Sequence, residues 1–549
     1  MKPETEQNVC AVCKVSAKRK CGGCRSVYYC GKEHQKAHWR EHWRKCKCYK
    51  LVENEKLGRH YVAVRRIEAG EIVIREEKPL VQGPQQDSVP VCLGCCVPLT
   101  SEIARPCEEC GWPLCQSCTS HGDECEFTKK YKSSKVSISG FGLTHPTYKC
   151  VSVIRALALR DSDPAAYKKF TNLSSHHEQP SFGDPGEVTQ FIKRFFDKLE
   201  DTSEEEIARA AGILLINGHE VPITEPSQIA VYDASSYLEH SCKANCAKSF
   251  TNSAGLIVRA ALGIEKGGHI TICYSDPLWG TANRRHYLLR TKFFECACER
   301  CSDPTELGTM FDALKCNRSD CRGNALPRTF LAAEVSDYLC DRCDNALSSR
   351  AVDELTERIG RELASIAKDD VAACRDFLKA HAGRLHENHF YMTDARLALA
   401  QLIGQQEGGL PALDAELLSE KILLCKKLDE LMKTIVPSEN RVRGLLLFEM
   451  HAAVAEFGRR RDKEQLLNIL QAETRKLNIT PTYLTYLQNY LNSTLHLQES
   501  KRLLEEAYQL LKYEPDVLPE GKIAKTAKMN LMEMELLIKT LCANAVMPL

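Results

Sequence analysis

Cysteines at metal-ligand spacing constrain this chain more than any other feature. The chain has 29 cysteines among 549 residues, and many stand in pairs with two to four residues between them. Such spacing lets two ligands reach one metal ion from a short turn, and closed sets of four Cys or His ligands are typical of structural zinc. Three histidines, His34, His42 and His121, each stand four residues from a cysteine. The sequence therefore predicts a fold built around zinc.

The candidate ligands form four groups along the chain. The first group is Cys10, Cys13, Cys21, Cys24, Cys30, His34, His42 and Cys46. The second is Cys92, Cys95 (with Cys96 as its alternative), Cys107, Cys110, Cys115, Cys118, His121 and Cys125. The third combines Cys242 with Cys296, Cys298 and Cys301, and the fourth is Cys316, Cys321, Cys340 and Cys343. At four ligands per ion, these 24 residues predict up to six structural Zn²⁺ ions.

Composition and charge exclude several other classes of protein. The net charge is +1 with a pI of about 7.4, so global charge does not predict a nucleic-acid binder. The first fifty residues are locally basic, which we interpret as a solvated surface, with a weak nucleic-acid or acidic-peptide contact as the alternative. No signal peptide and no apolar run long enough to cross a membrane is expected. Since zinc is favoured over disulfides in a reducing compartment, we expect the protein in the cytoplasm and nucleus.

A second pattern lies between residues 237 and 301. It contains Glu239-His240-Ser241-Cys242, then Asn245, then an apolar run that ends at Cys273-Tyr274, and finally the thiols from Cys296 to Cys301. This order resembles the SET domain of the SET and MYND domain lysine methyltransferases. In that family these segments thread together in a pseudoknot, with a methyl donor on one side and a lysine channel on the other.

The resemblance implies an α+β fold with several domains. The expected parts are a MYND zinc finger at 1–48, the N-terminal part of a β-rich SET domain at 49–90, a second MYND-like zinc cluster at 91–130, a helical insert at 131–212, the SET core at 213–295, a cysteine-rich post-SET region at 296–345, and an all-α, tetratricopeptide-like domain at 350–549. A monomer is expected.

The resemblance also implies how the zinc ligands pair. MYND fingers interleave their ligands, which would place Cys10, Cys13, Cys30 and His34 on one ion and Cys21, Cys24, His42 and Cys46 on the other. His34 stands where the family has Cys, and His38 is expected to pack rather than to bind metal. MYND fingers bind proline-containing peptides, so a docking role is implied.

The second cluster looks like a shortened MYND-like double site. A chain with both a terminal finger and this cluster resembles the arthropod branch of the family. Interleaving would place Cys92, Cys95, Cys115 and Cys118 on one ion and Cys107, Cys110, His121 and Cys125 on the other.

Family positions that hold S-adenosylmethionine map onto this chain. They are Gly58, Arg59, Asn217, Ser236, Glu239, His240 and Phe294. The expected reaction is methyl transfer to a lysine of a histone or another protein. The lysine amine must lose its proton, which a narrow apolar channel favours, and Tyr274 is expected to align nitrogen, methyl and sulfur.

Two departures from the family pattern leave a rival function open. Glu239 replaces an Asn that contacts the amino-acid end of the donor, and Lys292 replaces a channel tyrosine. The alternative is a catalytically weak or inactive adaptor that uses the MYND finger and the helical domain to recruit partner proteins.

Local patterns predict several elements. Alternation over 71–75 favours a half-buried strand, and the apolar run 213–216 favours a buried strand that ends at Asn217. Residues 131–212 are predicted to be mainly helical. After residue 350, one apolar stripe stops before Pro437 and another before Pro515, as in antiparallel helix pairs.

Overall fold

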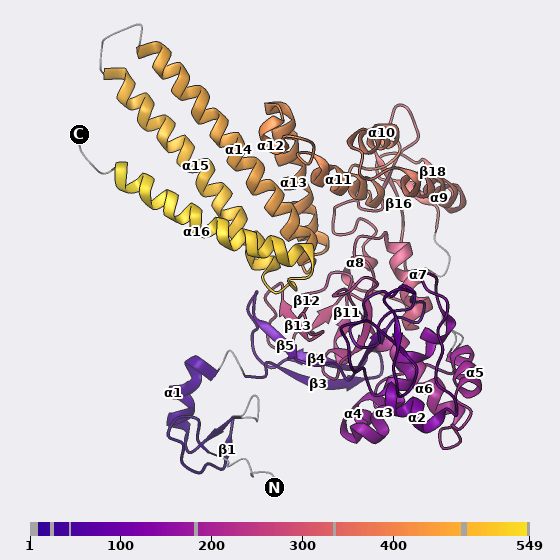
Figure 1. The fold of residues 1–549 in the computed structure, drawn as a ribbon. Coiled ribbons are helices and arrows are strands. Elements are labelled where there is room, and N and C mark those ends of the chain that lie inside the picture. The colour runs from indigo at the N-terminus through magenta and orange to yellow at the C-terminus, as the bar shows by residue number, and fades with distance from the viewer. Residues whose placement is uncertain are drawn as a thin grey trace. The chain divides into compact units, whose positions relative to one another are not determined.

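The computed structural model describes residues 9–21, 27–42, 46–179, 185–332, 336–473 and 480–545, and the side chains of 461–495, 537 and 540–545 are not described. The chain forms two compact units, Met1–Gln179 with Gly183–Ile272, and Pro180–Phe182 with Cys273–Leu549. Helices and strands both contribute, so the α+β class and the multi-domain organisation predicted from the sequence are confirmed (Figure 1).

The N-terminal zinc-ligand region has a small core of its own. Its elements are β1 (Arg19–Lys20), β2 (Tyr28–Tyr29) and α1 (Lys32–His42). Three of the candidate ligands, Cys10, Cys21 and Cys46, are buried there together with Ala17 and Tyr29. The ligands thus form a large part of this core, as expected where zinc replaces a conventional apolar interior.

Short sheets make up the strand-rich part of the first unit. A three-stranded antiparallel sheet has the order β12-β13-β5, from β12 (Cys246–Phe250), β13 (Leu256–Ala260) and β5 (Ile72–Glu76). All five residues of β13 are buried, which suits a central strand. Val73 and Ile74 of β5 are buried and Arg75 is exposed, so the predicted strand at 71–75 is confirmed.

The remaining strands of this unit bring distant parts of the sequence together. β3 (Tyr49–Asn54) pairs with β4 (Gly58–Ala63), and β11 (Glu239–His240) pairs in parallel with β14 (Thr271–Ile272). A further sheet and a small hairpin consist of β6 (Val81–Pro84), β10 (Gln228–Val231), β9 (His219–Val221), β7 (Arg105–Pro106) and β8 (Pro113–Leu114).

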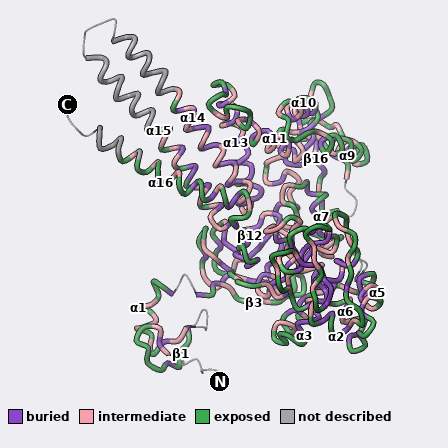
Figure 2. Tube along the Cα trace, viewed as in Figure 1, coloured by how far each residue is buried: buried purple, intermediate pink, exposed green. Residues whose placement is uncertain are grey.

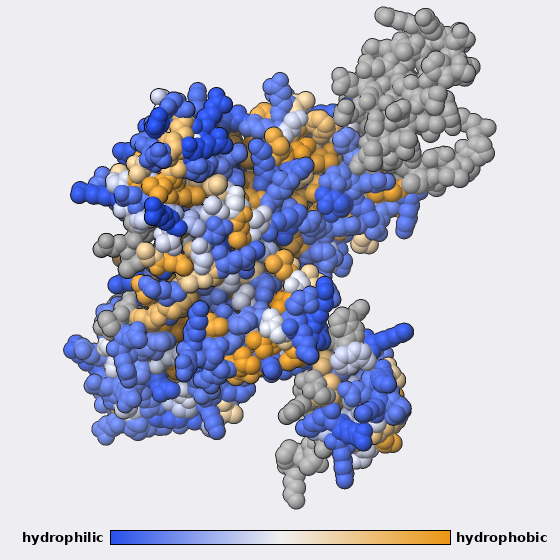
Figure 3. All heavy atoms as spheres, turned by 180° about the vertical axis from the view of Figure 1, so that it is seen from behind, coloured by the Kyte–Doolittle hydropathy of each residue, from blue (hydrophilic) through white to orange (hydrophobic). Residues whose placement is uncertain are grey.

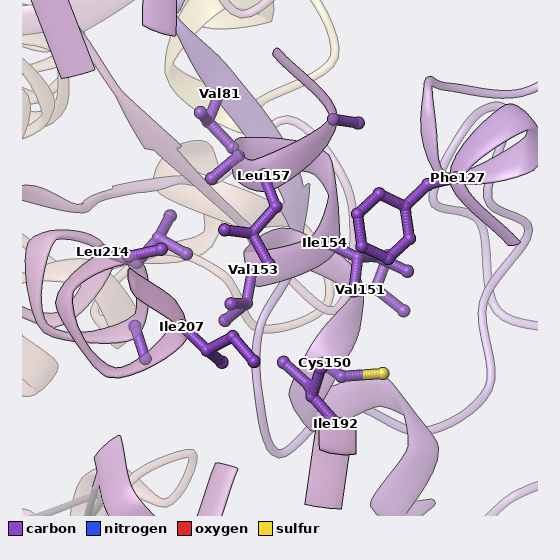
Figure 4. Packing of buried hydrophobic residues seen from close by; sticks show 14 of the residues in the cluster. Val81, Phe127, Cys150, Val151, Val153, Ile154, Leu157, Ile192, Ile207 and Leu214 are labelled. Carbon is purple, nitrogen blue, oxygen red and sulfur yellow. The ribbon is translucent and has the colours of Figure 1, made fainter. Parts of the chain in front are cut away.

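Helices form the largest apolar core of the first unit. They are α2 (Glu124–Tyr131), η2 (Pro146–Cys150), α3 (Val151–Ser162), α4 (Pro164–Thr171), α5 (Pro185–Phe195), α6 (Glu204–Asn217) and the short η3 (Ser235–Tyr237). Figure 4 shows Val153 and Leu157 of α3 on the side of Ile207 and Leu214 of α6. The mainly helical character predicted for 131–212 is confirmed.

The strand predicted at 213–216 is wrong, because these residues form the last turn of α6. The Ser203 hydroxyl accepts a hydrogen bond from the Glu206 amide at 3.1 Å and caps the helix. The buried residues Ile207, Ala210, Ala211 and Leu214 recur at three- and four-residue steps. A short apolar run cannot be assigned to strand or helix by itself, and here the upstream periodicity decides.

The second unit begins with two helices and a four-stranded antiparallel sheet. These are α7 (Thr281–Lys292), α8 (Glu299–Ser302), β15 (Leu314–Lys315), β16 (Asn324–Pro327), β17 (Tyr338–Cys340) and β18 (Ala346–Leu347). It continues with α9 (Ser349–Ser365), α10 (Val371–His381), α11 (Phe390–Leu402), α12 (Gly409–Ala412), α13 (Ala415–Ile435), α14 (Asn440–Glu473), α15 (Thr480–Leu511) and α16 (Pro519–Ala545).

The two predicted apolar stripes lie on helices of this unit. Leu428, Leu431 and Ile435 are buried on α13, which ends before Pro437, while Leu504 and Leu511 are buried on α15, which ends before Pro515. Figure 1 shows α14 and α15 side by side, and Figure 2 shows buried residues along α13 and the described part of α14.

Among the described residues, no helix combines the length and apolar character needed to cross a membrane. The face in Figure 3 is mostly hydrophilic, with apolar residues in scattered patches.

Candidate functional site

The first predicted zinc site assembles in the N-terminal finger. Cys10, Cys13, Cys30 and His34 have ligand atoms that all lie within 4.8 Å of one another. Cys30 precedes α1 and His34 lies in its first turn, so the helix start delivers two of the four ligands. The Sγ atoms of Cys13 and Cys30 are 3.6 Å apart, and Nδ1 of His34 is 3.0 Å from Cys30 Sγ. The imidazole therefore occupies the position that a fourth thiol would fill.

The second site of the finger is described in part. Cys21 and Cys46 place their Sγ atoms 3.7 Å apart, and His42 is buried. Cys24 lies outside the described residues, so this ligand set remains a prediction. His38 points Nδ1 to the Tyr29 hydroxyl at 3.0 Å and stacks on His42, in keeping with a packing role.

Two further sites assemble from residues 92–125. One group is Cys92, Cys95, Cys115 and Cys118, and the other is Cys107, Cys110, His121 and Cys125. Both match the interleaved pairing expected from the sequence. The alternative Cys96 is buried outside the first group and has a left-handed backbone with φ of 58°.

A buried carboxylate orients the histidine of this cluster. Nε2 of His121 faces Cys110 Sγ at 3.3 Å, while Nδ1 is 2.8 Å from Glu124 Oε1. Arg155 donates two hydrogen bonds of 2.7 Å to the same carboxylate. Burial alone would raise the pKa of Glu124, but Arg155 and His121 lower it to about 2. The anion therefore fixes the imidazole with Nε2 toward the thiols, as outer-shell carboxylates do at zinc sites.

The fourth group also assembles, within the second unit. Cys316, Cys321, Cys340 and Cys343 come from the ends of β15 and β17 and their loops. The remaining predicted set takes Cys242 from the first unit and Cys296, Cys298 and Cys301 from the second. This ligand set remains a prediction.

The sulfur spacing fits tetrahedral zinc. A zinc ion with Zn–S distances of about 2.3 Å holds its sulfur ligands about 3.8 Å apart. Sulfur pairs in three of these clusters, Cys95–Cys115, Cys107–Cys125 and Cys316–Cys343, are 3.8, 3.9 and 3.7 Å apart. Such distances are far longer than a disulfide bond of about 2.05 Å. Each complete cluster offers four protein ligands, which is the closed arrangement of a structural ion.

The start of β4 carries two of the predicted donor-binding residues. Gly58 has φ of +62°, and a Cβ placed on it would meet no atom within 4 Å. Arg59 donates from Nη2 to the carbonyl oxygen of Asn172 at 2.6 Å and lies over the Tyr237 ring at 5.0 Å. The backbone beside Gly58 is therefore open to a ligand, and Arg59 ties it to the segments around 172 and 237.

Glu239 is paired with a histidine that contacts β4. Its Oε2 is 2.5 Å from Nδ1 of His269, and the His269 ring stacks on His60 with centroids 4.9 Å apart and planes at 16°. Nδ1 of His60 is in turn 3.0 Å from the carbonyl oxygen of Gly58. A continuous set of contacts therefore connects Glu239 to Gly58.

The other predicted donor residues of this unit are partly or fully buried. Ser236 donates to the Tyr232 carbonyl oxygen at 2.6 Å, and Nε2 of His240 is 3.3 Å from Cys242 Sγ. Asn217 ends α6 and donates to the carbonyl oxygen of Ser174 at 2.8 Å. The loop after α4 therefore contacts both Asn217 and, through Asn172, Arg59.

In the second unit, the predicted catalytic and adenine-facing residues are neighbours. The rings of Tyr274 and Phe294 meet edge to face, with centroids 6.5 Å apart and planes at 82°. Lys292, which replaces the family tyrosine, is the last residue of α7, and Phe293 after it turns the chain with φ of 59°. This left-handed residue separates the helix from Phe294.

Two residues at this site were missed by sequence reasoning. His269 stands two residues before β14 and shares its face with Glu239 by strand alternation, a register that is set by the folded parallel pair. Asn172 acts through its backbone carbonyl oxygen, for which the sequence holds no signal.

Comparisons with known proteins agree with this geometry. The MYND finger family matches residues 10–46 and the SET domain family matches residues 58–275. The SET domain-containing protein SmydA-8, isoform A, of Drosophila melanogaster is 28% identical over 302 residues, which cover 52% of this chain and 63% of that protein. The human histone-lysine N-methyltransferase SMYD3 is 42% identical over 73 residues, covering 13% of this chain and 17% of that protein. The histone-lysine N-methyltransferase ASHR1 of Arabidopsis thaliana is 21% identical over 335 residues, covering 60% and 54%. The matches thus span less than two thirds of these relatives.

Proposed function

We propose that this chain is a SET and MYND domain protein-lysine methyltransferase that transfers a methyl group from S-adenosylmethionine to a lysine of another protein; the matches to the MYND finger and SET domain families support the proposal. The observation that carries the proposal is the convergence of the donor-binding residues in the first unit. Glu239 is connected to Gly58 through His269 and His60, and Arg59 lies over the ring of Tyr237, two residues before Glu239, although about 180 residues separate Arg59 from Glu239 in the sequence. Such convergence is what a cofactor pocket requires.

The residues fit the donor. The open space beside Gly58 suits close approach of a ligand to the backbone. Glu239 and His240 would hold the amino-acid end, and Phe294 would lie against the adenine, where an aromatic face binds well. When bound, S-adenosylmethionine supplies an activated methyl group on its sulfonium. Tyr274 would accept or donate a hydrogen bond that aligns the neutral lysine amine, and burial of the amine would favour loss of its proton.

The arthropod branch, in which a terminal finger and a second cluster occur together, is the assignment we favour within the family. The similarity to the Drosophila protein and the assembled second cluster support it. The MYND finger would dock a proline-containing segment of a partner, the protein would act as a monomer in cytoplasm and nucleus, and the substrate would be a histone or another protein.

Calorimetric titration of the zinc-loaded protein with S-adenosylmethionine is the first test. We expect stoichiometric binding that Phe294→Ala weakens about tenfold or more, since the aromatic face proposed to stack on the adenine is lost. A folded, zinc-loaded protein that binds no donor would contradict the proposal.

Tyr274→Phe separates binding from catalysis. The variant keeps the ring that meets Phe294, so we expect unchanged donor affinity and methyl transfer reduced about a hundredfold, as for loss of one aligning group. Transfer of radioactive methyl groups to a protein substrate measures it, and equal turnover by both proteins would remove Tyr274 from the mechanism.

A second function, a non-catalytic adaptor, is favoured by Glu239 and Lys292. In that case the donor residues would be a scaffold only, and the finger would bind partners with or without donor. The calorimetric titration distinguishes the two functions directly.

A further inference from the structure

Glu239 brings a carboxylate to the proposed donor site, and His269 contacts that carboxylate. Where the family has a neutral amide, this chain has a carboxylate, which attracts the ammonium group of the donor but repels its carboxylate. We propose that His269 is a positioning residue that makes Glu239 compatible with S-adenosylmethionine. The inference rests on the proposed function, which places the amino-acid end of the donor beside Glu239.

The geometry assigns the two oxygens of Glu239 different roles. His269 Nδ1 donates to Oε2 at 2.5 Å, and a carboxylate acceptor favours such a short hydrogen bond. Oε1 makes no hydrogen bond to any described residue, so it can accept from the donor's ammonium group. The hydrogen bond from His269 withdraws negative charge from the carboxylate and holds it in one rotamer. One oxygen is thus occupied by the protein and the other is presented to the ligand.

The His269 ring is fixed from two directions. Its face stacks on His60, which is buried, and His60 is itself held to Gly58 at the start of β4. Its backbone is fixed by Asn245, whose side chain donates to the His269 carbonyl oxygen at 2.8 Å and accepts from the Thr271 amide at 2.9 Å. Val62 of β4 forms an isolated β-bridge with His269. Because its backbone and ring are both held, His269 can impose one orientation on Glu239.

This arrangement explains why Glu239 need not abolish donor binding. Asn245 belongs to the same sequence motif as His240 and Cys242, so the motif that shapes the pocket also positions the residue that moderates Glu239. Glu239 also pairs with Thr271 across the parallel strands, and His269, two residues before Thr271, falls on the same face as Glu239 by strand alternation. The departure at 239 and the histidine at 269 therefore act as one unit.

A double-mutant cycle on the full-length, zinc-loaded protein tests the coupling. We expect His269→Ala to weaken S-adenosylmethionine binding about tenfold or more when Glu239 is present. In the Glu239→Asn background, His269→Ala should change affinity less than about threefold, because no charge remains to be moderated. Lys266→Ala, an exposed substitution on the same loop, is the matched control and should leave affinity unchanged.

A second ligand separates positioning from a structural role. 5′-Methylthioadenosine contains the adenosine and sulfur but no amino-acid end, so its affinity should be the same for the wild type and His269→Ala. If the substitution merely disturbed the fold, both ligands would lose affinity together.

Three results would overturn the inference. The first is an equal loss for His269→Ala in both backgrounds, and the second is no loss in either. The third is that Glu239→Asn binds the donor but the wild type does not. This result would mean that the pocket is intact and that His269 does not offset the charge of Glu239. If neither the wild type nor Glu239→Asn binds the donor, the proposed function fails and the inference fails with it.

Discussion

Four buried ionisable side chains lie close together in the second unit. Glu306 pairs with Arg284 and Arg300, all three with no exposed side-chain surface. Burial would raise the pKa of Glu306, but the two guanidinium groups lower it to about 2. Asp312 accepts from the Thr281 amide at 2.8 Å, and burial, reinforced by the charge of Glu306, raises its pKa to about 8. At neutral pH Asp312 is therefore a protonated acid beside an ionised one.

Asp312→Asn should remove a pH dependence of stability. A carboxyl group whose pKa rises from 3.8 in the unfolded chain to about 8 stabilises the fold fully below pH 4, and this contribution is lost as pH rises toward 8. Asn keeps an acceptor for Thr281 and a donor for Glu306 without a charge. Between pH 4 and pH 8, we expect the free energy of unfolding of the variant to rise by on the order of 2–4 kcal/mol relative to that of the wild type. Urea unfolding of both proteins at pH 4 and pH 8 measures this change. If the difference in their free energies of unfolding is the same at both pH values, the prediction is wrong.

The exposed residue Asp369 provides the control for this experiment. Asp369→Asn, an exposed substitution, should follow the wild type at every pH measured.

At the residue scale, the sequence predicts ligands far better than it predicts polar partners. The zinc ligands were identifiable because spacing of two to four residues reports local geometry. The pairing of Glu239 with His269, or of Glu306 with Arg284, joins residues more than twenty positions apart. Such pairs depend on tertiary packing, and a single sequence carries no local signal for them.

At the scale of elements, the start of α2 serves the second zinc cluster. Glu124 lies in its first turn and holds His121, while Arg155 of α3 holds Glu124. Glu124→Ala removes the orienting carboxylate and leaves a buried guanidinium without it. We expect zinc affinity at the His121 site to fall about 10- to 100-fold.

Competition with a chromophoric zinc chelator measures this loss. Glu126→Ala, an exposed carboxylate on the same helix, is the matched control and should release zinc as the wild type does. If Glu124→Ala releases zinc at the same chelator concentration as the wild type, His121 needs no outer-shell partner to hold the ion.

Element prediction succeeded where a periodic signal was long enough. The stripes on α13 and α15 extend over several turns and end near proline, so both helices were predictable. The strand predicted at 213–216 was wrong because four consecutive apolar residues are compatible with either a strand or one turn of a helix. The Ser203 cap and the three glutamates that follow it, which favour a helix N-terminus, were the overlooked signal.

At the scale of the whole molecule, both units contain clusters of Cys and His residues that could hold zinc. Four complete ligand sets lie within single units, three in the first and one in the second. Bound zinc contributes directly to folding free energy at such sites, since the ligands are not preorganised in the unfolded chain. Strong chelation should therefore unfold the cluster regions cooperatively and reversibly.

Zinc content measured by mass spectrometry of the native protein tests the number of sites. We expect six ions, and five after Cys107→Ser, because a closed tetrahedral site does not survive loss of a thiolate. A wild-type value of four would mean that the sets containing Cys24 and Cys242 bind no zinc.

The cysteines outside the predicted zinc sites make the protein suited to site-selective chemical labelling. Six of them, Cys48, Cys96, Cys150, Cys246, Cys374 and Cys425, are buried, and burial raises the pKa of the first two to about 11. Thiolates held by zinc react slowly with alkylating reagents. Of the remaining described cysteines, Cys273 alone is partly exposed, and it directly precedes Tyr274. A fluorophore on that sulfur would report, from the neighbouring residue, on whatever approaches the tyrosine.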